Sequence, residues 1–263
     1  MLSIAESRWL KTGSPTSRLQ FEIDRGDRFL LLDGRRAYHL GFGRQTCSFL
    51  FERLAGANQT VQIEATAEAL REGIKSLDDE VVGRVGLGLP EGEYSVVLAE
   101  SFVTPVKPGG THDYFLDEQV ALWGEDNFWC LPHDPRVPYF RAGDEDIGGG
   151  RRLFNFVVPM FPTKWLTMTT VAQYMEDLRT KASGTAVSVA VLDVRSPADW
   201  GDPKPDPVEH WCITHYLVDG HHKLNAAAEA GKKLRLLSFI AVSQGVSTRQ
   251  EIESVVELMS RTR

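Results

Sequence analysis

The segment 215–242, HYLVDGHHKLNAAAEAGKKLRLLSFIAV, constrains the fold more than any other part of the chain. With the two residues before it, its apolar and turn residues predict a buried strand over Ile213–Val218, a tight turn at Asp219-Gly220, a helix over His221–Ala230 and a second strand over Leu234–Val242. Gly231 follows the helix, where a left-handed backbone that ends the helix costs glycine little. We therefore expect a strand–turn–helix–strand unit that packs into a sheet.

The first turn of this helix carries an unusual charge. His221, His222 and Lys223 place basic side chains at the positive end of the helix dipole, where anions are favoured. Together with the free amides of the helix and a flexible Gly220, these residues would form a phosphate site. The alternative is a plain strand–turn–helix, in which Asp219 caps the helix and the histidines are exposed. The pattern leaves both interpretations open.

The run Asp219–Lys223, D-G-H-H-K, is followed by Ala226, Ala227 and Gly231. It resembles the signature segment of the ParB/sulfiredoxin-like superfamily, and most of all its D-G-H-H-[RK] branch, which includes free serine kinase. In that superfamily the turn holds the phosphates of a nucleotide. The resemblance implies that Gly220, His221, His222 and Lys223 bind the nucleotide. Lys223 stands where arginine is more usual, which keeps the charge but loses the bidentate fork.

The resemblance also implies a chemistry. It suggests a nucleotide-binding phosphotransferase that acts on a small-molecule acceptor, or a nucleotide hydrolase, with Mg²⁺ and ATP or ADP, or alternatively CTP. Asp219, His221 and His222 are then the candidate catalytic residues: Asp219 would hold Mg²⁺ or orient an acceptor hydroxyl, and the histidines would stabilise charge during phosphoryl transfer. Glu176 and Glu209 are candidate bases by residue type only. The alternative function is a non-catalytic nucleotide-sensing or partner-binding protein.

Composition limits the classes of partner and compartment. The 263 residues carry a net charge of −7, which argues against nucleic acid as a partner. No apolar run approaches the ~18 residues of a membrane span. Cys47, Cys130 and Cys212 lie far apart, without a C-x-x-C pair, which is typical of a reducing compartment. We expect a cytoplasmic protein, and the sequence leaves a homodimer open.

The order of the predicted elements indicates an α+β protein in two parts. Residues 1–150 form a smaller α+β region with a long aromatic loop, and residues 151–263 form the ParB/sulfiredoxin-like nucleotide-binding domain, a mixed sheet with flanking helices. The loop spans residues 105–152. Its aromatic residues are expected to pin it onto the core, where such loops often cover active sites: Tyr114, Phe115, Trp123, Phe128, Trp129, Tyr139 and Phe140.

The amino-terminal part gives weaker signals. Residues 1–18 are polar and predict a poorly ordered lead-in. Asp33-Gly34 lies between apolar runs and predicts a hairpin, and Thr46–Leu54 predicts a helix capped by Thr46. His112-Asp113 and His133-Asp134 are metal ligands by residue type, but their spacing matches no zinc or di-metal pattern.

Overall fold

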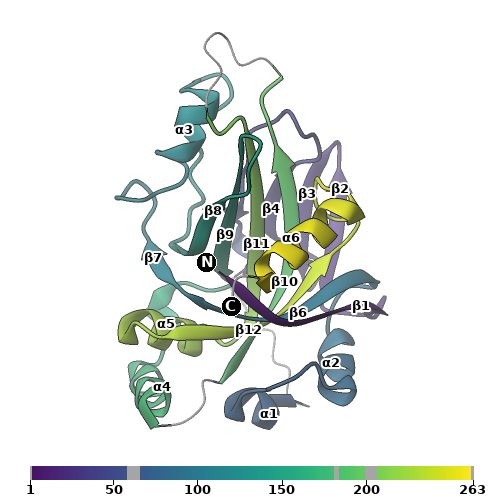
Figure 1. Cartoon of the computed structure of the whole chain (residues 1–263), viewed down its shortest axis with the longest axis vertical. Helices are drawn as coiled ribbons and strands as arrows, with labels where there is room; N and C mark the ends of the chain where they lie inside the picture. Colours follow the sequence, from purple (N-terminus) through teal and green to yellow (C-terminus); the bar gives the residue numbers. More distant parts are fainter. Residues whose placement is uncertain (1, 58–65, 181–183, 199–205, 262–263) are drawn as a thin grey trace.

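The computed structural model describes residues 2–57, 66–180, 184–198 and 206–261. Its centre is an eight-stranded sheet, which a four-stranded antiparallel sheet backs (Figure 1). In spatial order the large sheet consists of β1 (Ser3–Thr12), β6 (Gly92–Phe102), β12 (Lys233–Ala241), β10 (Thr185–Arg195), β11 (Glu209–Asp219), β9 (Arg151–Pro159), β8 (Tyr139–Asp146) and β7 (Thr104–Val106). The small sheet consists of β2 (Leu19–Asp24), β3 (Asp27–Leu32), β4 (Arg35–Phe42) and β5 (Glu52–Arg53). The large sheet is mixed, because β10–β12 and β11–β9 pair in parallel.

Helices flank the large sheet, so the predicted α+β class is confirmed. They are α1 (Ala67–Glu72), α2 (Asp79–Gly86), α3 (Glu118–Trp123), α4 (Met168–Thr180), α5 (His221–Ala230) and α6 (Arg249–Arg261), with 3-10 turns at Ala55–Ala57 and Thr163–Trp165. Within the described ranges, no helix has the length and apolarity needed to cross a membrane.

The large sheet curls back on itself. β6 and β7 are separated by Val103 alone, so one bent run of chain pairs with β12 and β1 along its first part and with β8 along its last. The Ser101 hydroxyl on β6 also donates a hydrogen bond to the Ala142 carbonyl on β8, at 2.8 Å. The second and seventh strands in the sheet order, β6 and β8, are thereby brought together.

The two faces of the large sheet bury different cores. The front face packs against α6, which lies across it in Figure 1, through Ile252, Val255 and Met259. The back face packs against the small sheet and an aromatic cluster. Four of the seven aromatic residues predicted to pin the long loop are buried, namely Tyr114, Phe115, Tyr139 and Phe140. Phe128 and Trp129 are instead 82% and 63% exposed.

Strands from both predicted parts share the large sheet. β1, β6, β7 and β8 precede residue 150, whereas β9 to β12 follow it. The predicted boundary falls in the turn between β8 and β9, which pair with each other. The hairpin at Asp33-Gly34 is confirmed as the connection of β3 and β4.

Two predictions for the amino-terminal part are wrong. Residues 3–12 form strand β1, which pairs with β6 at the edge of the sheet, instead of a disordered lead-in. Residues 46–54 form a loop and the short strand β5 instead of a helix. The reason for the second error is tertiary, because the buried Arg195 side chain binds the carbonyl of Cys47 in this segment and that of Arg44 just before it.

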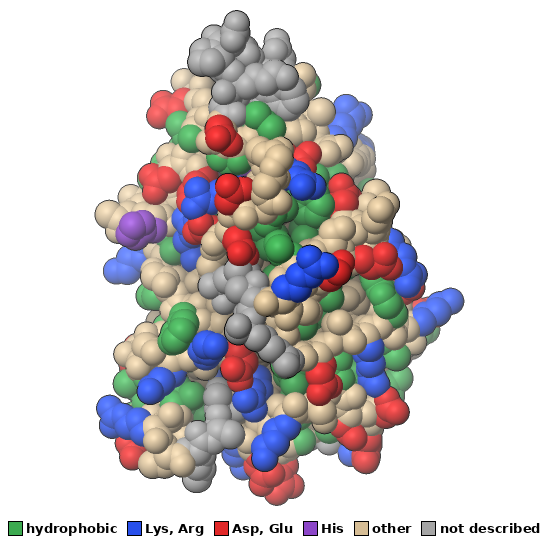
Figure 2. Space-filling model, in the orientation of Figure 1, with side chains coloured by type: hydrophobic (Ala, Val, Ile, Leu, Met, Phe, Trp, Pro, Cys, Tyr) green, Lys and Arg blue, Asp and Glu red, His purple; other side chains and the backbone are tan. Residues whose placement is uncertain are grey.

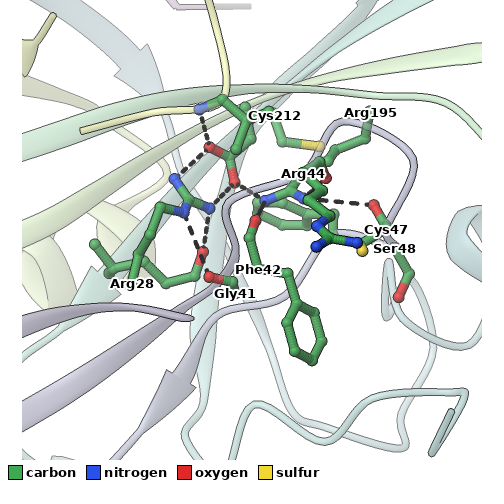
Figure 3. A network of polar contacts seen from close by, with 12 residues as sticks. Arg28, Gly41, Phe42, Arg44, Cys47, Ser48, Arg195 and Cys212 are labelled. Carbon is green, nitrogen blue, oxygen red and sulfur yellow. Dashed lines mark hydrogen bonds and ion pairs between the residues drawn. The ribbon is translucent and has the colours of Figure 1, made fainter. Parts of the chain in front are cut away.

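A buried carboxylate joins the two sheets. Asp193 on β10 receives a bidentate pair of hydrogen bonds from Arg28 on β3, at 2.8 and 2.6 Å, and one from Arg195 at 2.7 Å (Figure 3). Arg28 also donates to the Gly41 carbonyl, and Arg195 donates to the carbonyls of Phe42 and Arg44. Burial alone would raise the pKa of Asp193, but Arg195 and Arg28 outweigh it and lower the pKa to about 2.

We expect Asp193→Ala to lower the free energy of unfolding by about 3–5 kcal/mol, because two buried guanidinium groups would lose their counter-charge. Urea unfolding measures the change. The matched control is Glu253→Ala, which breaks an ion pair with Arg249 whose side chains are 48% and 50% exposed, and it should cost no more than about 1 kcal/mol. Equal costs for the two variants would contradict the role given to Asp193.

Candidate functional site

The predicted turn lies at the carboxyl ends of two parallel strands. β11 ends at Asp219 and its parallel neighbour β9 ends at Pro159, with Leu217 opposite Pro159 in the register. α5 begins directly after Gly220 and ends at Gly231, as the sequence predicted. This edge of a sheet is where open α/β folds bind their ligands. The turn is therefore the part of the molecule to test for a site.

The N-cap residue of α5 is Gly220, and not Asp219. Its φ of +94° is left-handed, and a Cβ atom added there would lie 2.6 Å from Cβ of Ala186, so the position requires glycine. The interpretation of Asp219 as a helix cap is wrong, since no described side chain caps this helix. The first intrahelical bond runs from the Leu224 amide to the Gly220 carbonyl at 2.9 Å. The amides of His221, His222 and Lys223 precede it and have no partner within the helix.

The two histidines bind the loop that follows β9. Nε2 of His221 accepts a hydrogen bond from the Met160 amide at 2.9 Å, and the ring stacks on Phe161 with centroids 3.9 Å apart. Nε2 of His222 accepts a hydrogen bond from the Thr167 amide at 3.0 Å. Both rings are acceptors at Nε2, so each carries its proton on Nδ1. Burial lowers the pKa of His221 to about 3, and the neighbouring His222 adds a smaller effect in the same direction. Burial also lowers the pKa of His222, although the negative charge of Asp219 opposes this shift.

Lys223 is a buried structural cation. Its side chain lies under the turn, and Nζ donates to the Leu70 carbonyl at 3.0 Å and to the Thr185 carbonyl at 2.8 Å. It thereby joins the end of α1 to the start of β10. The Asp219 carboxylate lies 3.6 Å from the same nitrogen, with its side chain 40% exposed. Lys223 holds the turn in place and does not extend into solvent.

Arg71 at the end of α1 is the exposed cation beside the turn. The net pKa of Tyr174 on α4 is raised, mainly by burial and then by the charge of Asp219. The positive charge of Arg71 opposes this shift. Nζ of Lys223 lies 6.0 Å from the Tyr174 ring centroid and 3.6 Å from the Asp219 carboxylate, and it binds the carbonyl of Leu70, the residue before Arg71. Sequence reasoning missed Arg71 and Tyr174, because no motif connects helices that lie so far apart in the chain.

The other predicted chemical groups lie elsewhere or are already engaged. Glu209 begins β11, at the opposite end from Asp219, and it accepts a hydrogen bond from the Trp211 ring. Glu176 is paired with Arg179 on the exposed side of α4. Asp219 is the carboxylate at the turn itself, and no cluster of three or more His, Cys, Asp or Glu side chains suited to a metal ion occurs in the described part of the chain. Of the predicted aromatic loop, α3 lies far from α5 in Figure 1, whereas Phe140 belongs to the same apolar cluster as Leu224 and Ala227 of α5.

We expect Lys223→Ala to lower the free energy of unfolding by about 2–4 kcal/mol, because the Leu70 and Thr185 carbonyls would lose their donor. Chemical denaturation measures the loss. Lys232→Ala, at an exposed lysine two residues after the helix, should change stability by less than about 0.5 kcal/mol. If the two variants are equally stable, the Lys223 ammonium group is free in solution and the structural role is wrong.

Comparison with known proteins gives no match to the chain. No family model fits the sequence. No curated protein and no solved structure is significantly similar to it either. The ParB/sulfiredoxin-like resemblance therefore depends on residues 216–231 and on the order of the elements around them.

Proposed function

We propose that the amino terminus of α5 binds the phosphate group of a small molecule, and that this molecule is a nucleotide. The observation that carries the proposal is the set of three amides at His221, His222 and Lys223, which have no helical partner and no side-chain cap. They lie at the carboxyl edge of β9 and β11. Amides in this arrangement bind anions through direct hydrogen bonds and through the helix dipole.

The basic side chains have different roles from those that the motif suggested. Lys223 and His221 are buried and hold the turn rigid, which fixes the direction of the amides. His222 is partly exposed, and its Nδ1–H can donate a hydrogen bond to a phosphate oxygen. Arg71 is exposed and follows Leu70, whose carbonyl binds Lys223, so it is the candidate cation for a bound phosphate. The affinity would come from a preorganised backbone and one arginine, not from a cluster of three cations.

Local geometry has to supply this affinity. The protein carries a net charge of −7, and on the face shown in Figure 2 Lys and Arg side chains are interspersed with Asp and Glu. Such a surface does not attract an anion over a distance. A helix terminus acts within its first turn, which suits a small phosphorylated ligand.

The choice of a nucleotide depends on the resemblance. The order β9, α4, β10, β11, α5, β12 is the order of elements that the ParB/sulfiredoxin-like resemblance implies. In that superfamily a turn of this sequence holds nucleotide phosphates. ATP, ADP and CTP are therefore the first ligands to test, with inorganic phosphate as the minimal one.

Phosphoryl transfer or nucleotide hydrolysis is the second candidate, and the exposed Asp219 carboxylate favours it. The carboxylate lies beside the amides, where it can bind Mg²⁺ together with nucleotide phosphates or accept a proton from a hydroxyl. One carboxylate fits Mg²⁺ only when phosphate oxygens complete the coordination. Mg²⁺ would neutralise charge on the phosphates, and the chain would supply the orientation. Turnover of ATP with Mg²⁺ and its loss in Asp219→Asn would distinguish this function from binding alone.

Two substitutions of His222 separate the effect of charge at the turn from the effect of a lost hydrogen bond. His222→Gln keeps an acceptor for the Thr167 amide and is neutral, so it should bind ATP within about threefold of the wild type. His222→Glu also keeps an acceptor but adds a negative charge, which favours the helix and repels phosphate. We expect it to weaken ATP binding about tenfold or more without lowering the melting temperature, by calorimetry and thermal unfolding.

Gln250→Glu provides the matched control, because it adds the same charge at the second residue of α6. It should leave ATP binding unchanged. The proposal is wrong if His222→Glu binds ATP like the wild type, or if Gln250→Glu weakens binding as much as His222→Glu does.

A further inference from the structure

A pocket lies far from the turn, past the other end of β10. It has a volume of about 550 Å³, within the range of small-molecule sites. Ala198 lines it, and β10 runs from Thr185 beside Lys223 to Arg195 just before Ala198. A strand of 11 residues spans about 35 Å, so the pocket and the turn are separate sites. What binds in the pocket is independent of the proposed function.

The walls of the pocket are aromatic. Phe42, Trp123, Trp129 and Leu131 supply its apolar lining. Trp129 is 63% exposed and Phe42 is 36% exposed, and both also line a neighbouring hollow. Exposed aromatic side chains of this size, grouped around one pocket, are typical of ligand sites.

The rim of the pocket is cationic. Arg25 and Arg44 line it, both are exposed, and neither makes an ion pair with a described residue. The carboxylate in the lining is Asp126, whose Oδ1 accepts hydrogen bonds from the amides of Phe128 at 2.8 Å and Trp129 at 3.3 Å. Asp126 is thus directed at the backbone of its own loop. Two guanidinium groups remain for an anion.

The loop that carries Phe42 and Arg44 is rigidly held. Arg195 binds the carbonyls of both residues, at 2.8 and 2.6 Å, and it is paired with Asp193, whose carboxylate it shares with Arg28. Figure 3 shows the loop wrapped around the Arg195 guanidinium, with the Phe42 ring directed away from it. The adjacent wall holds a hydroxyl in a fixed position, since Ser48 Oγ lies 2.9 Å from Nε2 of His133. A preorganised wall of this kind lowers the entropy cost of binding.

From these observations we infer that the pocket binds a planar aromatic anion, a ring system that carries a carboxylate or another acidic group. The ring lies between Phe42 and the two tryptophans, and the acidic group pairs with Arg44 and Arg25. Aromatic walls select a flat apolar body, and the arginine fork selects planar anions.

Isothermal titration calorimetry with 2-naphthoate and its neutral isostere 2-naphthamide tests the inference. We expect the naphthoate to bind about tenfold more tightly than the amide, because only the anion pairs with arginine. Arg44→Gln should weaken naphthoate binding about fivefold to tenfold and leave the amide within about twofold. Trp129→Ala should weaken both ligands about fivefold or more, because it removes the apolar wall.

Matched variants away from the pocket serve as controls. Arg35→Gln removes an exposed arginine from the start of β4, and Phe102→Ala removes a phenylalanine that is 59% exposed. Neither should change the affinity for either ligand. The inference is overturned if naphthoate gives no binding at millimolar concentration, if the amide binds equally well, or if Arg35→Gln acts like Arg44→Gln.

Discussion

The packing of the two sheets against each other depends on one buried carboxylate. Asp193 is 1% exposed and lies between the guanidinium groups of Arg28, from the small sheet, and Arg195, from the same strand as itself. A buried ion pair is costly unless its remaining hydrogen-bonding groups are satisfied. Here most of the surplus donors bind backbone carbonyls of the chain between β3 and β5, so the same charges that join the sheets also shape a loop. Nε of Arg195 is the exception, since this buried donor has no hydrogen-bond partner among the described residues.

The turn before α5 follows the same physical rule on a smaller scale. Lys223 joins α1 to β10, and the two histidines join α5 to the loop after β9. The sequence predicted these side chains as phosphate ligands, but in the structure they hold the turn against its neighbours. Their effect on a ligand is indirect, because they fix three backbone amides in one direction. An anion at this position would meet a rigid donor set, with Arg71 as the nearby exposed cation.

Helices and strands that depend on neighbouring residues could be predicted from the sequence. Contacts between residues far apart in the chain could not. The helix His221–Ala230 and its end at Gly231 follow from periodicity and a glycine, which act over a few residues. The partners of Lys223 lie 153 and 38 residues away, so no motif reveals them. Residues 46–54 have an apolar spacing that suits a helix, but Arg195 binds the carbonyls of Arg44 and Cys47 and holds the start of this segment in a turn. The strand at residues 3–12 was missed because it contributes few apolar side chains to the core.

The measurement that tests the central claim most directly is the amide spectrum of the protein labelled with ¹⁵N-histidine, recorded during a titration with ATP and Mg²⁺. The chain has seven histidines, so few signals need assignment. If phosphate oxygens accept hydrogen bonds from the first turn of α5, the amides of His221 and His222 move downfield, while that of His215, inside β11, stays in place. If ATP leaves the His221 and His222 amides unchanged, the amino terminus of α5 does not bind phosphate.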